Sequence, residues 1–359
     1  MKILFYINTL GKGGAERVVT NLANQFADEN NTIILVTSYK VEKEYKTNSN
    51  VKRICLEDYK KSSKNKIFKN INIIRQLKKI ICMKKPDLVV SFMREPVVRA
   101  LLASRKLDVK NIISIRNDPS KEYPGITGKL ISKYILPKAD GCVFQTEDAK
   151  KYFPIKLQGK SKIIFNQVDE KFFDVNIYDP KYIVSIGRLS HQKNQMMLIN
   201  AFAKVNEKYP DEKLLIYGDG ELKEKLKNEI NKKGLEDRIL LMGLTDNIPK
   251  VLSKAKMFIL SSDYEGMPNT LLEAMAAGVP CISTDCPCGG PKAIINHGVD
   301  GILVPVNNEK ELAKNILLLL EDNEFSNEIR KNAKEKSEIF KPNNIFKQWQ
   351  EYFEQVINN

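Results

Sequence analysis

The sequence predicts an α/β protein built from two doubly wound domains, each a parallel sheet with crossover helices. Short apolar runs rich in β-branched residues alternate with helical patterns along the chain. This alternation stops near residues 165–179 and then starts again. A length of 359 residues also corresponds to about two domains of ordinary size.

The first half of the chain contains five predicted strands. Helical patterns separate them, as at Glu16–Ala27 and Lys69–Met83. Because each strand is followed by a helix before the next strand, the strands are expected to run parallel. The predicted strands are Ile3–Ile7, Thr32–Thr37, Leu88–Phe92, Ile112–Ile115 and Gly141–Gln145.

The second half repeats this organisation with six predicted strands. They are Tyr182–Ile186, Lys213–Tyr217, Ile239–Met242, Met257–Ser261, Pro280–Ser283 and Gly301–Val304, with helices at Gln195–Asn206, Leu222–Lys233 and Glu311–Leu320 between them. We therefore expect an N-terminal domain at 1–165 and a C-terminal domain at 166–343. The last segment, 344–359, is expected to form a final helix.

The composition narrows the class of protein. Hydrophobic residues make up 42% of the chain, which is enough for two cores, but no apolar run approaches the ~18 residues of a transmembrane helix. The apolar N-terminus is too short for a signal peptide. The six cysteines do not form the dense framework of a small secreted domain. We expect a cytoplasmic protein.

The positive charge is concentrated in the first domain. Residues 1–165 contain 33 Lys and Arg against 15 Asp and Glu, whereas the remainder contains 25 against 29. Residues 60–85 alone contain ten Lys and Arg and no acid. This segment is either a basic amphipathic helix on anionic lipid or a core helix with a solvated basic face. The charge of the whole domain favours contact with an anionic membrane. The apolar positions at helical spacing are Ile67, Ile71, Ile74, Leu77 and Ile81.

The most informative stretch is Glu265–Pro280. It places Glu265 in a loop and Glu273 inside the helix that follows, and Gly278 is expected to end that helix. The free amides at a helix start can bind a phosphate. Glu273 lies about one turn further in, within reach of hydroxyls on the molecule that carries the phosphate. This arrangement suits a diphosphate with sugars attached.

This stretch resembles the Glu-x7-Glu signature of the retaining nucleotide-sugar glycosyltransferases of family 4. Other motifs of the family follow in the right order, and the similarity spans nearly the whole chain. The matching segments are Gly11–Arg17, Ile186–Asn194, Tyr217–Glu221, and Gly289–Pro291 with Gly301–Val304. The resemblance implies the GT-B fold, in which two Rossmann-like domains face one another across a cleft. In this fold the final helix, at about 344–359, would pack back on the first domain.

The resemblance also implies roles for three candidate catalytic residues. Arg188 and Lys193 would hold the diphosphate of the donor without a metal ion, and the sequence contains no Asp-x-Asp motif in a plausible metal position. Glu265 would contact hydroxyls of the donor sugar. Whether Glu265 also has a chemical role stays open. No cofactor is expected.

Further residues are expected at the donor. Glu273 would bind the ribose, glycines would let the backbone approach phosphate, and Leu244 would lie at the edge of the base pocket. The full donor-binding set is Gly13, Gly14, Gly187, Gly218, Gly243, Leu244, Gly266, Met267, Pro268, Asn269, Thr270 and Glu273.

The first domain departs from the family pattern. Many relatives have a histidine in the segment that matches residues 113–118, where this chain has Arg116 and Asn117. Arg116 either donates a hydrogen bond on the sugar or acceptor side or forms a structural salt bridge with Asp118. The frequent glutamate after Gly-Gly-Pro is also missing, with Lys292 in its place.

Taken together, these features predict a hexosyltransferase that needs no metal. It would move a sugar from a nucleotide sugar, with UDP as the expected carrier, to a lipid-linked saccharide acceptor in capsule, exopolysaccharide or other surface-glycan synthesis. It would lie on the inner face of the plasma membrane. The alternatives are an epimerase or a phosphorylase of the same fold, or a nucleic-acid-binding protein. The last lacks aromatic residues interleaved with its basic segment.

Overall fold

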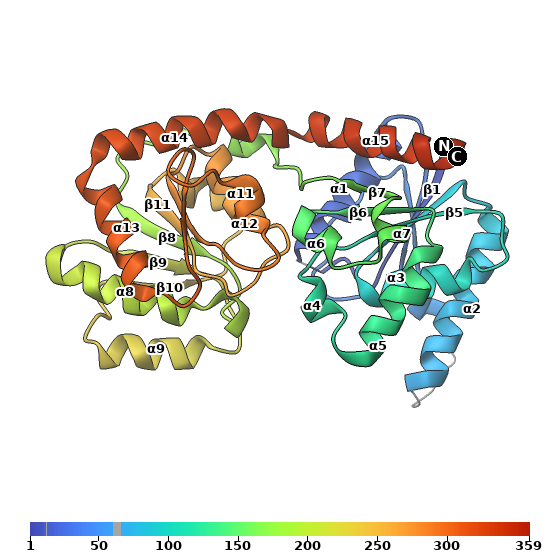
Figure 1. Cartoon of the computed structure of the whole chain (residues 1–359), viewed down its shortest axis with the longest axis horizontal. Helices are drawn as coiled ribbons and strands as arrows, with labels where there is room; N and C mark the ends of the chain where they lie inside the picture. Colours follow the sequence, from blue (N-terminus) through green and yellow to red (C-terminus); the bar gives the residue numbers. More distant parts are fainter. Residues whose placement is uncertain (12, 60–65) are drawn as a thin grey trace. The chain divides into compact units, whose positions relative to one another are not determined.

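The computed structural model describes residues 1–11, 13–59 and 66–359. The chain forms two compact units. Unit 1 comprises Met1–Asn166 together with Ile345–Asn359, and unit 2 comprises Gln167–Asn344. Each unit contains one parallel sheet with helices around it (Figure 1). These sheets confirm the predicted fold class.

The sheet of unit 1 has seven strands in the order β3-β2-β1-β4-β5-β6-β7. The chain order reverses between β1 and β4, which are hydrogen-bonded neighbours. This reversal is the topological switch point at which open α/β sheets bind their ligands. The strands are β1 (Lys2–Ile7), β2 (Thr32–Thr37), β3 (Val51–Cys55), β4 (Leu88–Phe92), β5 (Lys110–Ser114), β6 (Gly141–Phe144) and β7 (Ser161–Ile163).

Both faces of this sheet are buried, because successive side chains of a strand point to opposite faces. On β1, Ile3 and Phe5 pack in one apolar cluster, whereas Leu4 and Tyr6 pack in another. The first cluster includes helices α1 and α15, and the second includes α2 and α3. The helical elements of unit 1 are α1 (Gly14–Asp28), η1 (Leu56–Tyr59), α2 (Lys66–Lys84), α3 (Arg94–Ala103), α4 (Pro119–Glu122), α5 (Gly125–Leu130), η2 (Ile131–Ile135), η3 (Leu136–Lys138), α6 (Glu147–Lys151), α7 (Ile155–Gln158) and α15 (Pro342–Asn358).

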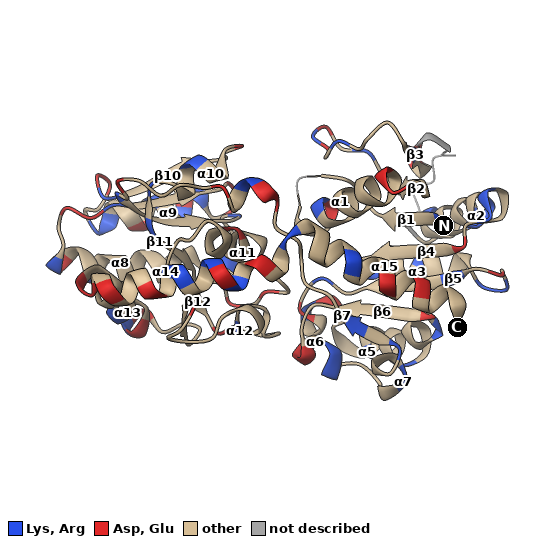
Figure 2. Cartoon of the chain, turned by 90° about the horizontal axis from the view of Figure 1, so that it is seen from above, with Lys and Arg blue, Asp and Glu red and all other residues tan. Residues whose placement is uncertain are grey.

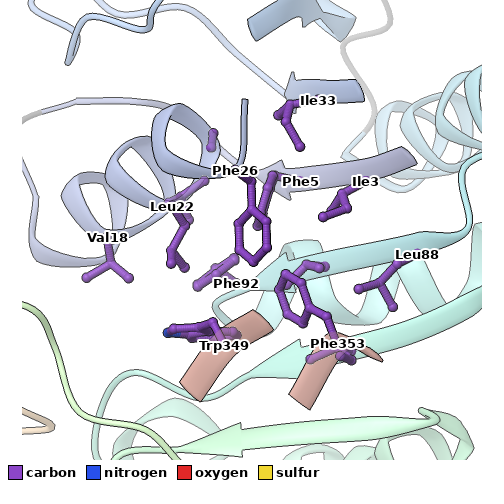
Figure 3. Packing of buried hydrophobic residues seen from close by; sticks show 14 of the residues in the cluster. Ile3, Phe5, Val18, Leu22, Phe26, Ile33, Leu88, Phe92, Trp349 and Phe353 are labelled. Carbon is purple, nitrogen blue, oxygen red and sulfur yellow. The ribbon is translucent and has the colours of Figure 1, made fainter. Parts of the chain in front are cut away.

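Helix α15 belongs to unit 1 for nearly its whole length because its apolar stripe is buried there. Trp349 and Phe353 lie among Phe5, Phe26 and Phe92 in the core of that unit (Figure 3). The stripe repeats at the helical spacing of three and four residues. Its members are Ile345, Trp349, Tyr352, Phe353 and Val356.

Unit 2 has a six-stranded parallel sheet in the order β10-β9-β8-β11-β12-β13. This is the same topology as the first six strands of unit 1, with the switch point between β8 and β11. The elements are η4 (Glu170–Phe172), β8 (Tyr182–Ile186), η5 (His191–Lys193), α8 (Gln195–Lys208), β9 (Leu214–Tyr217), α9 (Lys223–Lys232), β10 (Ile239–Gly243), α10 (Ile248–Leu252), β11 (Ala255–Leu260), α11 (Asn269–Ala276), β12 (Cys281–Thr284), α12 (Gly290–Ile294), β13 (Ile302–Val304), α13 (Glu309–Glu321), α14 (Asn323–Ser337) and η6 (Glu338–Phe340).

Helix α2 contains the described part of the basic segment, which was expected to be either an amphipathic helix on lipid or a core helix with a solvated basic face. Leu77 and Ile81 are buried against the sheet, so this part of α2 is a core helix with a solvated basic face. Ile67 and Ile71 do not join them and are exposed. Residues 60–65 of the predicted basic segment lie outside the described residues. Among the described helices, none has both the length and the apolar character needed to cross a membrane.

Candidate functional site

The loops after β8 and β11 leave the same edge of the unit 2 sheet. Because β8 and β11 are parallel neighbours at the switch point, their carboxyl ends lie together. The loop after β8 contains the predicted Arg188 and Lys193, and the loop after β11 contains Glu265. The topology alone therefore brings two predicted site segments into one crevice.

Lys193 and Glu265 form an ion pair in this crevice. Lys193 Nζ lies 2.5 Å from Glu265 Oε1, and the two side chains are 19% and 8% exposed. Ser262 donates a second hydrogen bond to the same carboxylate oxygen at 2.6 Å. A buried charge is stable only with such partners. The pair fixes an ammonium group and a carboxylate beside each other at the sheet edge.

Hydrogen bonds lock the two loops together behind this pair. Ser261 Oγ donates to the carbonyl of Lys193 at 2.9 Å, and Asp263 N donates to the carbonyl of Gln192 at 2.8 Å. Asn194 Nδ2 donates to Asp263 Oδ1 at 2.7 Å, while Asn194 Oδ1 caps the start of α8. Asn194 has a φ of 43°, which asparagine tolerates better than most residues. These hydrogen bonds hold the Lys193 loop against the Glu265 loop.

A third loop, before α12, packs against the Glu265 loop. Glu265 N donates to the carbonyl of Pro287 at 2.9 Å. A Cβ on Gly290 would lie 1.8 Å from the carbonyl oxygen of Gly266, so only glycine fits there. Burial and the Glu265 charge raise the pKa of the Cys286 thiol to about 12, which keeps this cysteine protonated. The Gly-Gly-Pro motif thus supports the glutamate loop.

Helix α11 follows the Glu265 loop. Its first amides have no acceptor within the helix, as at every helix start, and Leu271 N already bonds the carbonyl of Pro268. Met267 and Pro268 are buried, and Asn269 and Thr270 are half-buried. Glu273 is only 1% exposed, on a helix that ends at Ala276 and is followed by Gly278 with a φ of 70°. Carboxylates are rarely buried to this extent unless they are paired.

Glycines also join the remaining donor motifs. Gly218 has a φ of 144°, and a Cβ there would lie 1.9 Å from the carbonyl oxygen of Gly187. Gly243, with a φ of 72°, ends β10 and accepts a hydrogen bond from Gly218 N at 2.8 Å. These contacts bring the ends of β8, β9 and β10 together. Leu244 and Arg188 lie at the surface, and the Arg188 guanidinium forms no ion pair with the described side chains.

In unit 1, the predicted glycines lie between β1 and α1, after the carboxyl end of a strand at the switch point. Gly13 is the N-cap of α1, and Gly14 is its first residue. The Glu16 carboxylate lies over Gly13, where a Cβ would be 2.3 Å from Glu16 Oε2. A phosphate at this helix start would therefore have to displace Glu16.

Arg116 lies in the interior of unit 1. Its guanidinium is 5.3 Å from the ring of Phe92 and 5.4 Å from that of Trp349, and it donates to Asn166 Oδ1 at 2.8 Å. Burial lowers the pKa of Arg116 to about 9, so the group stays charged near neutral pH. The expected alternative of a salt bridge with Asp118 is wrong, because the Asp118 carboxylate caps α4 instead.

Asn117 is half-buried beside Arg116 and accepts a hydrogen bond from Asp118 N at 2.9 Å through its own side chain. Sequence reasoning missed Glu122, which follows in the same segment. Glu122 Oε1 accepts a hydrogen bond from Arg94 N, at the start of α3, at 2.7 Å. Burial raises the pKa of Glu122 to about 7. No motif indicated this residue, because its environment comes from another strand end.

Sequence reasoning also assigned no role to Ser262 and Asn194, which hold the Lys193–Glu265 pair. Asn194 was part of a quoted motif, whereas Ser262 had no signal beyond its place after a strand. No group of three or more His, Cys, Asp or Glu side chains among the described residues is arranged to hold a metal ion.

Two family models match the chain. Residues 167–336 match the model for glycosyl transferases group 1, and residues 2–141 match the glycosyl transferase 4-like model. An uncharacterized glycosyltransferase of Methanocaldococcus jannaschii is 32% identical over 357 residues, which cover 83% of this chain and 87% of the relative.

A second relative has a named activity. It is the Campylobacter jejuni GalNAc-alpha-(1->4)-GalNAc-alpha-(1->3)-diNAcBac-PP-undecaprenol alpha-1,4-N-acetyl-D-galactosaminyltransferase, 29% identical over 100% of this chain and 99% of its own. The chain is thus related to transferases that act on lipid-linked saccharides.

Solved structures with low identity share the fold. HepE of Anabaena in complex with UDP and glucose has a TM-score of 0.80 at 20% identity, covering 99% of this chain and 100% of its own. Sucrose-phosphate synthase of Thermosynechococcus elongatus has a TM-score of 0.86 at 18% identity, with 99% of each chain covered. The chain belongs to glycosyltransferase family 4, has the GT-B fold, and is a hexosyltransferase.

Proposed function

We propose that unit 2 binds a nucleotide sugar, with UDP as the carrier, and that the enzyme transfers its sugar with retention and without a metal ion. The observation that carries this proposal is the Lys193–Glu265 pair at the switch point, directly before α11. It supplies a cation for a diphosphate and a carboxylate for sugar hydroxyls. In a complex, Lys193 would share its three donors between Glu265 and a phosphate.

Arg188 would be the second cation. It is exposed and forms no ion pair with a described side chain, so its fork of donors is available to a phosphate oxygen. The amides that open α11 would complete the diphosphate site. Two fixed cations and a helix start supply the charge that a divalent metal supplies in other phosphate sites. We therefore assign Arg188, Lys193 and Glu265 to the transfer step.

The nucleoside would lie on the remaining motifs. Glu273 would accept hydrogen bonds from the ribose hydroxyls, because a buried carboxylate gains most from such donors. Gly218 and Gly243 would let the base approach the backbone, with Leu244 at the edge of that pocket. The HepE structure contains UDP, which favours uridine over other bases.

The acceptor would be a saccharide on a lipid diphosphate, and unit 1 would receive it. This part rests on the named activity of the Campylobacter relative and on the excess of Lys and Arg in residues 1–165. The exposed Ile67 and Ile71 at the start of α2 suit contact with an anionic membrane surface. Gly13 and Gly14 would let the backbone approach the donor phosphate, whereas Arg116 and Asn117 would lie on the sugar or acceptor side.

A thermal-shift panel tests the donor assignment. Purified protein with 5 mM EDTA is heated with UDP, GDP, ADP and their glucose or N-acetylglucosamine conjugates; we expect UDP and one UDP-sugar to raise the melting temperature most. Arg188→Ala should diminish that shift, and Lys292→Ala, a lysine after the glutamate loop without an assigned role, should leave it unchanged. Stabilisation by none of the nucleotides would contradict the proposal.

A further inference from the structure

The segment between β5 and β6 contains a helix with its apolar side facing outward. Helices α5 and η2 form one continuous helical run from Gly125 to Ile135. Its buried side carries small residues, Gly128 and Ser132. Ile131 and Ile135 are half-buried, whereas three other large residues face outward: Ile126 is 78%, Leu130 50% and Tyr134 56% exposed. A surface helix of a globular protein normally has the opposite arrangement.

The spacing shows that this exposure is a continuous stripe and not three scattered residues. Ile126, Leu130 and Tyr134 are four residues apart, so they stand one above another on the same side of the helix. The buried side cannot take larger residues, because a Cβ on Gly128 would lie 2.0 Å from the carbonyl oxygen of Tyr123. The packing against Tyr123 therefore fixes which side faces outward.

Lysines flank the stripe, and no acid balances them locally. Lys129 and Lys133 are exposed on the same run, and Lys138 follows it. The segment from Tyr123 to Ala139 contains no Asp or Glu. Figure 2 shows α5 in tan with blue residues. An aliphatic and aromatic stripe between lysines matches the interface of an anionic bilayer, where the rings and alkyl chains enter and the ammonium groups contact phosphates.

The place of the stripe in unit 1 fits the same partner. The segment starts at the carboxyl end of β5, the sheet edge that also carries Gly13 and the start of α3. Figure 1 shows α5 in green at the periphery of unit 1, beside α3. A membrane held against α5 would thus lie near the sheet edge at which open α/β folds bind ligands.

We propose that the stripe Ile126–Leu130–Tyr134, with Lys129 and Lys133, docks unit 1 on an anionic lipid surface. This inference rests on the proposed function in that it assumes a membrane-borne acceptor. It assigns the contact to α5 and η2 in addition to the start of α2.

Vesicle sedimentation at low salt tests the stripe. The full chain should sediment with vesicles of phosphatidylglycerol and phosphatidylcholine and remain in solution with phosphatidylcholine alone. The triple variant I126S/L130S/Y134S should bind at least tenfold more weakly, although α2 is intact. Lys129→Gln and Lys133→Gln should each weaken binding by roughly fivefold, which corresponds to the attraction of one basic residue near such a surface.

A matched control removes apolar surface elsewhere. Val299 and Ile339 of unit 2 are 52% and 49% exposed, so V299S/I339S should sediment like the unmodified chain. Unchanged melting temperature and UDP binding in the triple variant would show that it is folded. Sedimentation of the triple variant at the original affinity would overturn the inference. The inference would also be overturned if light scattering showed that the unmodified chain is a dimer, and if the triple variant were a monomer that still binds vesicles.

Failure of this inference is distinguishable from failure of the proposed function. If the unmodified chain binds UDP and transfers sugar to a detergent-dispersed acceptor, the proposed function stands whether or not α5 binds vesicles. If it binds vesicles through α5 but binds no nucleotide, only the docking inference stands.

Discussion

Units 1 and 2 share one strand order but differ in what they bury near the carboxyl ends of their strands. In unit 2, the cation of Lys193 is paired with Glu265 and supported by Ser262. In unit 1, the cation of Arg116 has two aromatic rings and the side-chain amides of Asn166 and Gln145 as neighbours. The same sheet topology therefore carries a charged crevice in one unit and an aromatic-lined interior in the other.

Because the sheets share this order, the loops after the strands determine which side chains each unit presents at its sheet edge. In unit 2, backbone contacts as close as those of Gly218 with Gly187 and Gly290 with Gly266 join the motif loops to one another. In unit 1, aromatic contacts hold α15 against the sheet, because Trp349 packs against Phe92 (Figure 3). The guanidinium of Arg116 lies 5.4 Å from the Trp349 ring.

The largest effect is expected for Lys193→Met. It removes the partner of a buried carboxylate, which typically costs about 3–5 kcal/mol of unfolding free energy, and it should lower transfer by about 10²–10³-fold, as removal of one transition-state donor does. Urea unfolding and initial rates with a UDP-sugar would measure both effects. In the double variant with Glu265→Gln, most of the stability should return and the activity should not. If Lys193→Met were as stable as the original protein, the ion pair would not stabilise the fold.

The matching test in unit 1 is Trp349→Ala. Trp349 is fully buried, so its truncation should lower the unfolding free energy by about 3–5 kcal/mol. Lys347→Ala, an exposed residue of the same helix, is the control and should change it by less than about 0.5 kcal/mol. UDP binding should persist in both folded variants, because the proposed diphosphate and nucleoside contacts lie in unit 2. Loss of UDP binding in folded Trp349→Ala protein would show that donor binding depends on the core of unit 1 as well as on unit 2.

The raised pKa of Glu122 in unit 1 predicts that the free energy of unfolding depends on pH. Its folded pKa of about 7 lies above the ordinary 4.5, so the folded protein keeps a proton that the unfolded chain releases. Stability should therefore fall as the pH rises from about 4.5 to 7, by about 3 kcal/mol in total. Glu122→Gln should be more stable than the original at pH 8 and equal to it at pH 4. Chemical unfolding at both pH values measures this, with the exposed Glu147→Gln as control. If the free energies of unfolding of Glu122→Gln and the original protein differed by the same amount at pH 4 and pH 8, the raised pKa of Glu122 would be contradicted.

Gly290→Ala should have a smaller effect on stability and a selective effect on donor binding. The added methyl would meet the carbonyl of Gly266, and such overpacking costs typically about 1–3 kcal/mol. Because the Glu265 loop must shift, UDP affinity should fall. Gly159→Ala is the control, since a Cβ there meets its nearest neighbour at an ordinary 3.5 Å. Equal UDP affinity in the two variants would show that the loop contact is unimportant.

The strands that the sequence predicts well are those buried on both faces, such as β2 and β8, because continuous apolar runs identify them. It misses β3, whose Lys52 and Arg53 interrupt the apolar pattern at the sheet edge, and β7, which has only three residues. It also misses the polar helix α14. Such elements form because tertiary contacts stabilise them, and the local sequence does not indicate those contacts.

The candidate site shows the same limit. Lys193, Glu265 and Glu273 stand in motifs and are found directly, whereas Ser262 acquires its role only when two strand ends meet. Arg116 is placed between Phe92 and Trp349, which come from distant parts of the chain, so its burial has no local signal. The outward stripe on α5 looks like an ordinary amphipathic pattern until the structure shows which side is buried.

In the proposed function, fixed cations of unit 2 bind the diphosphate of a nucleotide sugar without a metal ion. Isothermal titration calorimetry with UDP in EDTA tests it most directly. We expect binding that added magnesium does not strengthen, and a loss of at least tenfold in affinity for both Arg188→Ala and Lys193→Ala. Binding that requires magnesium, or that is unchanged in both variants, would contradict it.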